Sequence, residues 1–377
     1  MTEFWLISIP LDKTSLQSLE KMNRVVSKTR MASSFRFPIP ELKVGTLDIL
    51  LSVSDELTRL DVYTEGVIRK ISQSMSEVME HSKDKVQENT LANGESETQK
   101  KIAKSPYKAY FQALLVDLAS YVTCFQWDRA KYSTALPLKT LTEVISKQVF
   151  QTETELKSRS AAYSNVKASL EGVERRIEGN LQIRVLRDVV KKEDLVLGSE
   201  YLTTLLVVVP RKILDESEGG LFTVTLFKKS VSNFKAKARQ NKFTVREFSF
   251  EESEKQGQEM TRLNTNKKEQ YGTFVRWLKV NFSEVFVAWI HLKALQVFVE
   301  SVMRYGLPVN FQTVLLQPDR KRGKKVRNLL DSLYEHLDSA AAASTPDVGL
   351  DIPGMNTALQ EYYSYIFYKI DVNLMNS

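Results

Sequence analysis

The residues with the greatest chemical potential in this 377-residue chain are one cysteine, three histidines and one dense run of basic side chains. The histidines, His81, His291 and His336, lie far apart, and none belongs to a C-x-x-C or H-x-x-x-H spacing that closes a tetrahedral zinc site. Cys124 lies in the hydrophobic sequence Tyr121–Trp127, which is typical of a structural cysteine rather than of a nucleophile. We therefore expect neither a metal site nor a catalytic thiol.

The sequence also lacks the common catalytic and nucleotide-binding motifs. It contains no G-x-x-x-x-G-K-[ST], no G-x-G-x-x-G, no G-x-S-x-G and no H-E-x-x-H. Phosphate-binding loops need glycine, and the chain has only 14. His291 lies between Ile290 and Leu292 in an apolar segment, where we expect a core or interface histidine rather than a general base. We predict a protein that is not an enzyme and has no cofactor.

The densest charge of the chain lies in one segment near the C-terminus. Its six basic residues, here called the basic segment, are Arg320, Lys321, Arg322, Lys324, Lys325 and Arg327. They supply six of the seven net positive charges, so the rest of the chain is nearly neutral. Binding of duplex nucleic acid usually needs a broad basic face. The segment therefore has two interpretations: a solvated loop that leads into a helix, or an interaction surface, with nucleic acid or another polyanion as the alternative partner.

The overall composition is that of a globular protein. Its 42% apolar and 26% charged residues exclude disordered, collagen-like and fibrous classes, and its length predicts two or three domains. A single cysteine cannot form an intramolecular disulfide, which favours a reducing compartment such as the cytosol. The start of the chain has an acid, Glu3, where a signal peptide needs a basic region, and charges interrupt the most apolar segment, 274–304. We expect no membrane span.

Strand-like and helical patterns alternate along the chain. Alternating β-branched and aromatic residues predict strands over 3–9, 201–209, 221–227, 243–250 and 362–374. Helical periodicity predicts helices over 16–27, 48–92, 228–241 and 274–304. The segment 251–270 is so polar that we expect it to project into solvent or lie against a partner helix. The fold class that follows is α+β and mainly helical.

The most regular pattern is a heptad-like seam over residues 149–177. Its nine positions, of which seven are apolar or aromatic, are Val149, Thr152, Leu156, Arg159, Tyr163, Val166, Leu170, Val173 and Ile177. This 3-4 spacing predicts a coiled-coil-like helix. Thr152 and Arg159 weaken a true coiled coil, so an ordinary long helix on a globular core stays an alternative. Long helices around a small α/β module, with strands at both chain ends, predict that the two ends share one domain.

Many stretches of the sequence resemble the C subunit of the vacuolar-type proton ATPase (V-ATPase). The longest are Val275–Glu284, Ala288–His291 and Arg304–Phe311. Others, in the same order as in that family, are Met1–Ser8, Leu42–Asp48, Ser82–Asn89, Leu91–Gly94, Phe125–Asp128, Ala130–Tyr132, Leu156–Arg159, Leu205–Pro210 and Val224–Lys228. The resemblance covers nearly the whole chain. The run Gly219–Val224 is closest to the second, tissue-restricted form of this family.

The resemblance implies an elongated, boot-shaped molecule. Its parts are a foot from residues 1–137 and 305–377, a neck of long helices from 138–180 and 251–304, and an α/β head from 181–250. It implies a non-catalytic stator and regulatory subunit that ties the peripheral stalks, made of the E and G subunits, to the a subunit of the membrane sector. It also implies roles in reversible assembly and organelle acidification, and actin binding.

The resemblance also implies where the protein works and what it does not bind. We expect a cytoplasmic protein, peripheral on the cytosolic face of endomembranes or the plasma membrane, that meets the membrane only through the pump. Nucleic acid is not an expected partner. Two departures from the family pattern stand out: a short connection between Pro210 and Gly219 predicts a shortened head, and the extra segment from Glu95 to about Leu115 predicts an insertion in the foot.

Overall fold

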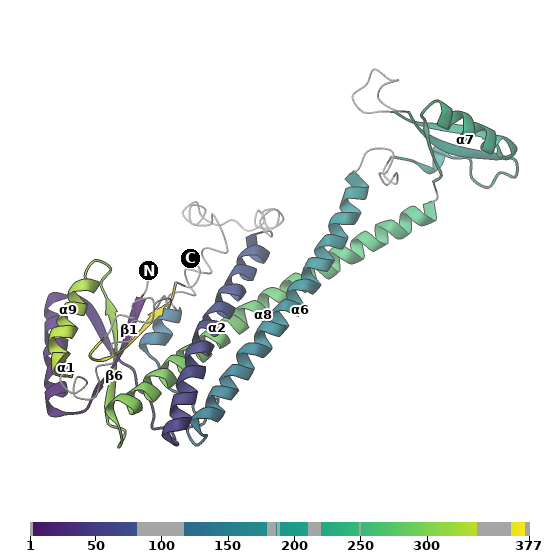
Figure 1. Ribbon diagram of the computed structural model, residues 1–377. Helices are drawn as coiled ribbons and strands as arrows, with labels where there is room; N and C mark the ends of the chain where they lie inside the picture. Colours follow the sequence, from purple (N-terminus) through teal and green to yellow (C-terminus); the bar gives the residue numbers. More distant parts are fainter. Residues whose placement is uncertain are drawn as a thin grey trace, which may run out of the picture. The chain divides into compact units, whose positions relative to one another are not determined.

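The computed structural model describes residues 3–80, 117–178, 186, 189–209, 220–248, 250–337 and 363–373 (Figure 1). The described residues are mainly helical and contain two small antiparallel sheets, which confirms the α+β class. The chain divides into a first unit, residues 1–157 with 275–377, and a second unit, residues 158–274. The finer division into foot, neck and head stays a prediction.

The first unit contains a four-stranded sheet with the strand order β2-β6-β1-β7. Its strands are β1 (Glu3–Pro10), β2 (Ala32–Arg36), β6 (Phe311–Pro318) and β7 (Ile366–Asp371). β1 lies in the middle of the sheet, antiparallel to both β6 and β7, and its interior residues are buried. The first and last described strands, β1 and β7, are therefore neighbours in one sheet.

Helices α1 (Lys13–Thr29) and α9 (Gly323–Tyr334) lie on one face of this sheet (Figure 1). The Asp12 carboxylate caps α1 by accepting the Ser15 N–H at 2.7 Å. Arg30, in the left-handed backbone region with φ of 49°, ends α1 and turns the chain into β2. The core between helices and sheet includes Trp5, Ile7, Met22, Val26, Leu316, Val326 and Leu330. A short 3₁₀ turn, η4 (Glu335–Leu337), follows α9.

The remainder of the first unit is built from long helices. They are α2 (Leu47–Glu80), a short helix over 117–123, and parts of α6 (Leu138–Glu178) and α8 (Phe250–Tyr305). An 18-residue window within Gly257–Tyr305 has a mean hydropathy of 1.5, which is apolar enough for a membrane span by composition, yet 89% of it is buried inside the protein. A helix that is apolar on all sides needs neighbours on all sides. α8 is therefore the central core helix of this unit.

The second unit contains a three-stranded antiparallel sheet with the order β4-β3-β5. Its strands are β3 (Leu202–Val209), β4 (Gly220–Phe227) and β5 (Thr244–Arg246), and its short helices are η2 (Lys192–Asp194), η3 (Lys228–Ser230) and α7 (Val231–Gln240). The centre of β3 is buried on both faces because Leu206 packs with Leu186 and Val190 while Val207 faces the other side. The predicted α/β module is present.

Burial along α6 follows the predicted seam at most of its positions. Val149, Thr152, Leu156, Tyr163 and Leu170 are buried, whereas Val166 and Val173 are half-buried. Arg159 is exposed, so the seam is interrupted where the sequence places a charge. Within the second unit the Tyr163 ring contacts the rings of Tyr271 and Phe274 on α8. The seam is therefore a real packing surface of an ordinary long helix.

One local strand prediction is wrong. The strand expected over 243–250 is only the three residues of β5, and Phe250 already begins α8. The polar segment 251–270 forms the first part of the 56-residue helix α8, which continues into the apolar segment, and its described side chains are exposed or half-buried, as its polarity predicts. Cys124 is exposed although its neighbours Val122 and Phe125 are buried. Residues 81–116, with the predicted insertion and His81, lie outside the described residues.

Candidate interaction surface

The basic segment lies at the turn from β6 into α9. The Asp319 N–H donates to the Met31 carbonyl at 2.8 Å, and the Arg322 N–H donates to the Asp319 carbonyl at 2.8 Å, which closes the turn. The Val326 N–H then donates to the Arg322 carbonyl at 3.0 Å and begins α9. A loop that leads into a helix, as one interpretation of the sequence expected, is what the structure contains.

The amphipathic sequence of α9 decides which residues of the segment face outward. Its buried residues Val326, Leu330, Leu333 and Tyr334 repeat every three or four positions and face the sheet. Five residues of the basic segment are exposed or largely so: Arg320, Lys321, Arg322, Lys324 and Lys325. The positive charges therefore lie together on the outside of the first unit.

Two of the six basic residues also have structural contacts. The Arg322 guanidinium donates to the Thr29 carbonyl at the end of α1, at 2.5 Å, and lies 3.7 Å from the Asp319 carboxylate. The Arg327 guanidinium lies over the Tyr363 ring, 5.2 Å from its centroid, and also approaches two further aromatic rings of β1 and β7. These two arginines hold α9 against its neighbours, so the residues better placed for a partner are Arg320, Lys321, Lys324 and Lys325.

The position of Lys324 and Lys325 opposes helix stability. Both lie in the first turn of α9, which contains no acidic residue, and Arg322 at the N-cap position provides no side-chain cap. The N-terminal end of a helix carries a partial positive charge, so cations there are unfavourable and anions favourable. This end of α9 therefore attracts acidic groups by its side chains and by its backbone together.

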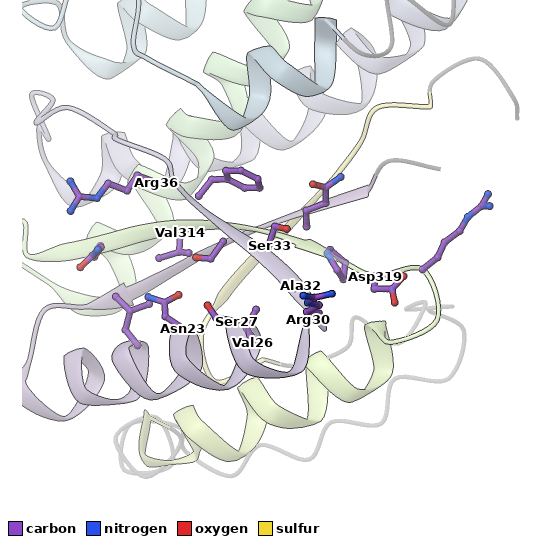
Figure 2. A pocket seen from close by; sticks show the side chains of 16 residues that line it. Asn23, Val26, Ser27, Arg30, Ala32, Ser33, Arg36, Val314 and Asp319 are labelled. Carbon is purple, nitrogen blue, oxygen red and sulfur yellow. The ribbon is translucent and has the colours of Figure 1, made fainter.

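The structure adds two basic residues, Arg30 and Arg36, to those that the sequence indicates. Arg30, Arg36 and Arg320 line an open groove of about 950 Å³ between α1, β2 and the end of β6 (Figure 2). Arg30 and Arg36 lie far from Arg320 in the sequence, and the pairing of β2 with β6 brings them together. No periodicity or spacing in the sequence signals this pairing. The candidate surface is therefore larger than the basic segment.

His291 is the core residue that its sequence context predicts. Its Nε2 accepts the Asp128 N–H at 3.0 Å and its Nδ1 donates to the Val287 carbonyl at 2.8 Å, so the neutral ring is satisfied at both nitrogens. The ring packs among Phe125, Trp127 and Tyr132. Burial lowers its pKa below the ordinary value of 6.5. His291 therefore connects the loop after the helix over 117–123 to α8.

A comparison with known protein families shows to which family the chain belongs. The profile of the family of V-ATPase C subunits matches residues 4–216 and 211–366. The chain belongs to this family. The C 1-A subunit of the V-type proton ATPase of Danio rerio is 50% identical over 402 aligned residues, which cover 100% of both chains. The C 1 subunit of Mus musculus is 51% identical, and the alignment covers 100% of this chain and 99% of that one.

Membership of the V-ATPase C-subunit family confirms the resemblance found in the sequence. Proteins of this family are accessory components of a V-type proton pump and peripheral parts of its cytosolic sector, so this chain takes part in proton transport. Among the described residues, no cluster of three or more His, Cys, Asp and Glu side chains is suited to a metal ion.

Proposed function

We propose that this chain is a non-catalytic stator and regulatory subunit that bridges the E–G peripheral stalks of the V-type pump to the a subunit of the membrane sector. The observation that carries the proposal is the family match, which extends over almost the whole chain at about half identity. In this role the protein controls reversible assembly of the two pump sectors and thereby acidification of organelles. Actin is a further partner of the same kind, bound from the cytosolic side.

The basic segment is the proposed docking site of the first unit. Arg320, Lys321, Lys324 and Lys325 are exposed, and the two lysines occupy a helix end where they cost stability. Charges that cost stability where they lie favour a binding role over a role in folding. An acidic surface elsewhere in the pump would neutralise both the side chains and the helix end. We assign this acidic surface to the membrane-sector a subunit.

The connection between Pro210 and Gly219 supports a second, structural part of the proposal. The two ranges matched by the family profile, 4–216 and 211–366, overlap in this connection, which is expected where family sequence is missing. The alignment with the Danio rerio relative is also longer than this chain, 402 against 377 residues. We infer that the family's additional segment belongs here and that its loss weakens the contact of the second unit with an E–G pair.

Titration of the purified chain tests the proposed bridge. We expect it to bind a purified E–G pair and, separately, the cytosolic domain of the a subunit, and to form a complex of all three. Lys324→Glu with Lys325→Glu should weaken binding to that cytosolic domain at least about tenfold, or about 1.4 kcal/mol, without changing binding to E–G. The matched control is Lys228→Glu with Lys229→Glu, which removes the same charge from the second unit. A folded chain that binds neither partner contradicts the proposal.

A further inference from the structure

The edge of the sheet in the first unit has the properties of a peptide-binding site. β2 is the terminal strand of the order β2-β6-β1-β7, so within the described part of the chain its outer edge has no partner strand. An open groove of about 950 Å³ lies beside this edge, between β2 and α1 (Figure 2). Unpaired strand edges bind other strands through the backbone, and proteins usually protect them.

The register of β2 shows which backbone groups are free. The Asp319 N–H donates to the Met31 carbonyl, so Met31 and Asp319 form a hydrogen-bonded pair. Because such pairs occur at every second residue of an antiparallel ladder, the backbone groups of Met31, Ser33 and Phe35 point toward β6. On the other side of β6, the Leu11 N–H donates to the Asn310 carbonyl. The backbone groups of the even-numbered residues of β6 therefore point toward β1, which leaves the odd-numbered ones for β2 and agrees with this assignment. The backbone N–H and C=O groups of Ala32, Ser34 and Arg36 therefore point away from the sheet.

The same residues also contribute side chains to the groove. Ser34 and Arg36 pair with Leu316 and Val314, which belong to the core beneath α1 and α9. Side chains of directly paired residues lie on the same face of a sheet, so Ser34 and Arg36 face the α1 side. A chain added at the edge would thus meet free backbone groups and, beside them, a polar groove.

The charges of the groove are positive at both of its ends. Figure 2 shows Arg36 at one end and Arg30 with Asp319 at the other, where Arg320 follows in the chain. None of these three arginines has an ion pair among the described residues, whereas Asp319, the acidic lining residue, lies 3.7 Å from Arg322. The strand β2 itself spans about 13 Å from Ala32 to Arg36, and Arg30 lies beyond its first residue. An extended segment with carboxylates toward both of its ends would match this distribution of charge.

A polar atom of α1 inside the groove also has no partner. The side-chain Oδ1 of Asn23 is buried and forms no hydrogen bond within the described structure. Ser27 on the same helix and Gln312 on β6 line the groove beside it. Buried polar groups are normally satisfied. Asn23 Oδ1 is therefore an unused hydrogen-bond acceptor in the wall of the groove.

From these observations we propose that the groove and the free edge of β2 bind an extended, acidic segment of a partner protein, which adds to the sheet as a further antiparallel or parallel strand. The backbone of β2 supplies the affinity that strand addition gives, and Arg30, Arg36 and Arg320 select carboxylates. The proposal deepens the docking role proposed for the first unit and rests on it. Beyond that role, the proposal specifies the β2 edge as the binding site and an unfolded, acidic segment as its ligand.

The test uses a display library of random peptides, about 12 residues long, selected against the full chain. We expect the enriched peptides to be acidic and poor in proline, since a strand that donates and accepts backbone hydrogen bonds cannot contain proline at those positions. The affinity of the strongest peptide is then measured by fluorescence anisotropy for each variant. Enriched peptides without acidic character, or no enrichment at all, would overturn the proposal.

Ser34→Pro and Ser34→Ala form a matched pair of variants. Proline removes the outward N–H of Ser34 without removing a bond to β6, whereas alanine removes only the hydroxyl. We expect Ser34→Pro to weaken peptide binding at least about tenfold and Ser34→Ala to leave it within about twofold, with melting temperatures recorded for both. Equal affinities of the two variants would mean that the edge is not used.

A charge variant keeps the test decisive if Ser34→Pro fails to fold. Arg36→Gln with Arg320→Gln should lose at least about tenfold in affinity, whereas Lys324→Gln with Lys325→Gln, outside the groove, should lose less than about threefold. If the groove variant instead loses binding to vesicles of phosphatidylserine and phosphatidylcholine while peptides are unaffected, the site binds lipid and the proposal is wrong. If both groove variants still bind the E–G pair and the a subunit as the wild type does, this inference is refuted, whereas the proposed bridge stays intact.

Discussion

At the scale of single residues, His291 makes a pH-dependent contribution to stability. The folded state holds the ring neutral, because burial lowers its pKa below 6.5, whereas the unfolded chain takes up a proton as the pH falls through that value. The unfolded state then binds more protons, so the free energy of unfolding decreases with falling pH. The loss begins near the ordinary pKa of 6.5 and continues down to the lower pKa of the folded state.

His291→Gln isolates this effect. An amide can still accept the Asp128 N–H and donate to the Val287 carbonyl, but it does not titrate. We expect the variant to be less stable than the wild type, with a difference in unfolding free energy that shrinks between about pH 7.5 and about pH 5.5. Denaturant titrations of both proteins across this range measure it. A difference that stays constant with pH would show that His291 is not held neutral.

Substitution of Lys324 and Lys325 is expected to stabilise the folded protein, in contrast to substitution of His291. Replacing both by glutamate places negative charge at the positive end of α9, where it is favourable. We expect the melting temperature to rise by about 2 °C, while binding of an acidic partner becomes weaker. Calorimetry of the double variant beside the wild type decides this. An unchanged or lower melting temperature would indicate that the lysines have a structural role.

At the scale of elements, the α6 seam is the best test of helix packing. Leu170 is fully buried in the seam of the second unit, so Leu170→Asp buries a charge without a partner. We expect a loss of roughly 3 kcal/mol or more in the free energy of unfolding. The control is Ser169→Asp at the exposed neighbouring position, which should change the free energy of unfolding by no more than about 0.5 kcal/mol. If Leu170→Asp unfolds at the same denaturant concentration as the control, the seam faces water.

The elements also show which parts of the fold the sequence can predict. The α6 seam was predictable because burial of one helix face leaves a 3-4 spacing that needs no knowledge of the partner. Residues 243–250 alternate like a strand, but only Thr244–Arg246 pair with β3, since pairing depends on a neighbour that local sequence does not specify. For the same reason the basic segment was visible as a run of charges, whereas Arg30 and Arg36 joined it only through the register of β2 on β6.

At the scale of the whole molecule, the proposed stator role requires resistance to torque through several contacts. Two contacts on one rigid partner reinforce each other through effective concentration, so losing part of one costs only part of the avidity. We predict that inserting the family's longer connection between Pro210 and Gly219 tightens binding to an isolated E–G pair at least about tenfold, or about 1.4 kcal/mol. Titration of both versions against the same E–G pair measures this. Equal affinities would mean that the short connection is functionally complete.

The proposed bridge is tested most directly with membrane vesicles that contain the membrane sector of the pump and lack its C subunit. The cytosolic sector, also without its C subunit, is added together with this chain, and ATP-driven proton uptake is followed with a pH-sensitive dye. We predict that uptake appears only when the chain is present and is reduced by Lys324→Glu with Lys325→Glu. Assembly and proton uptake that are the same with and without the folded chain would contradict the bridging role.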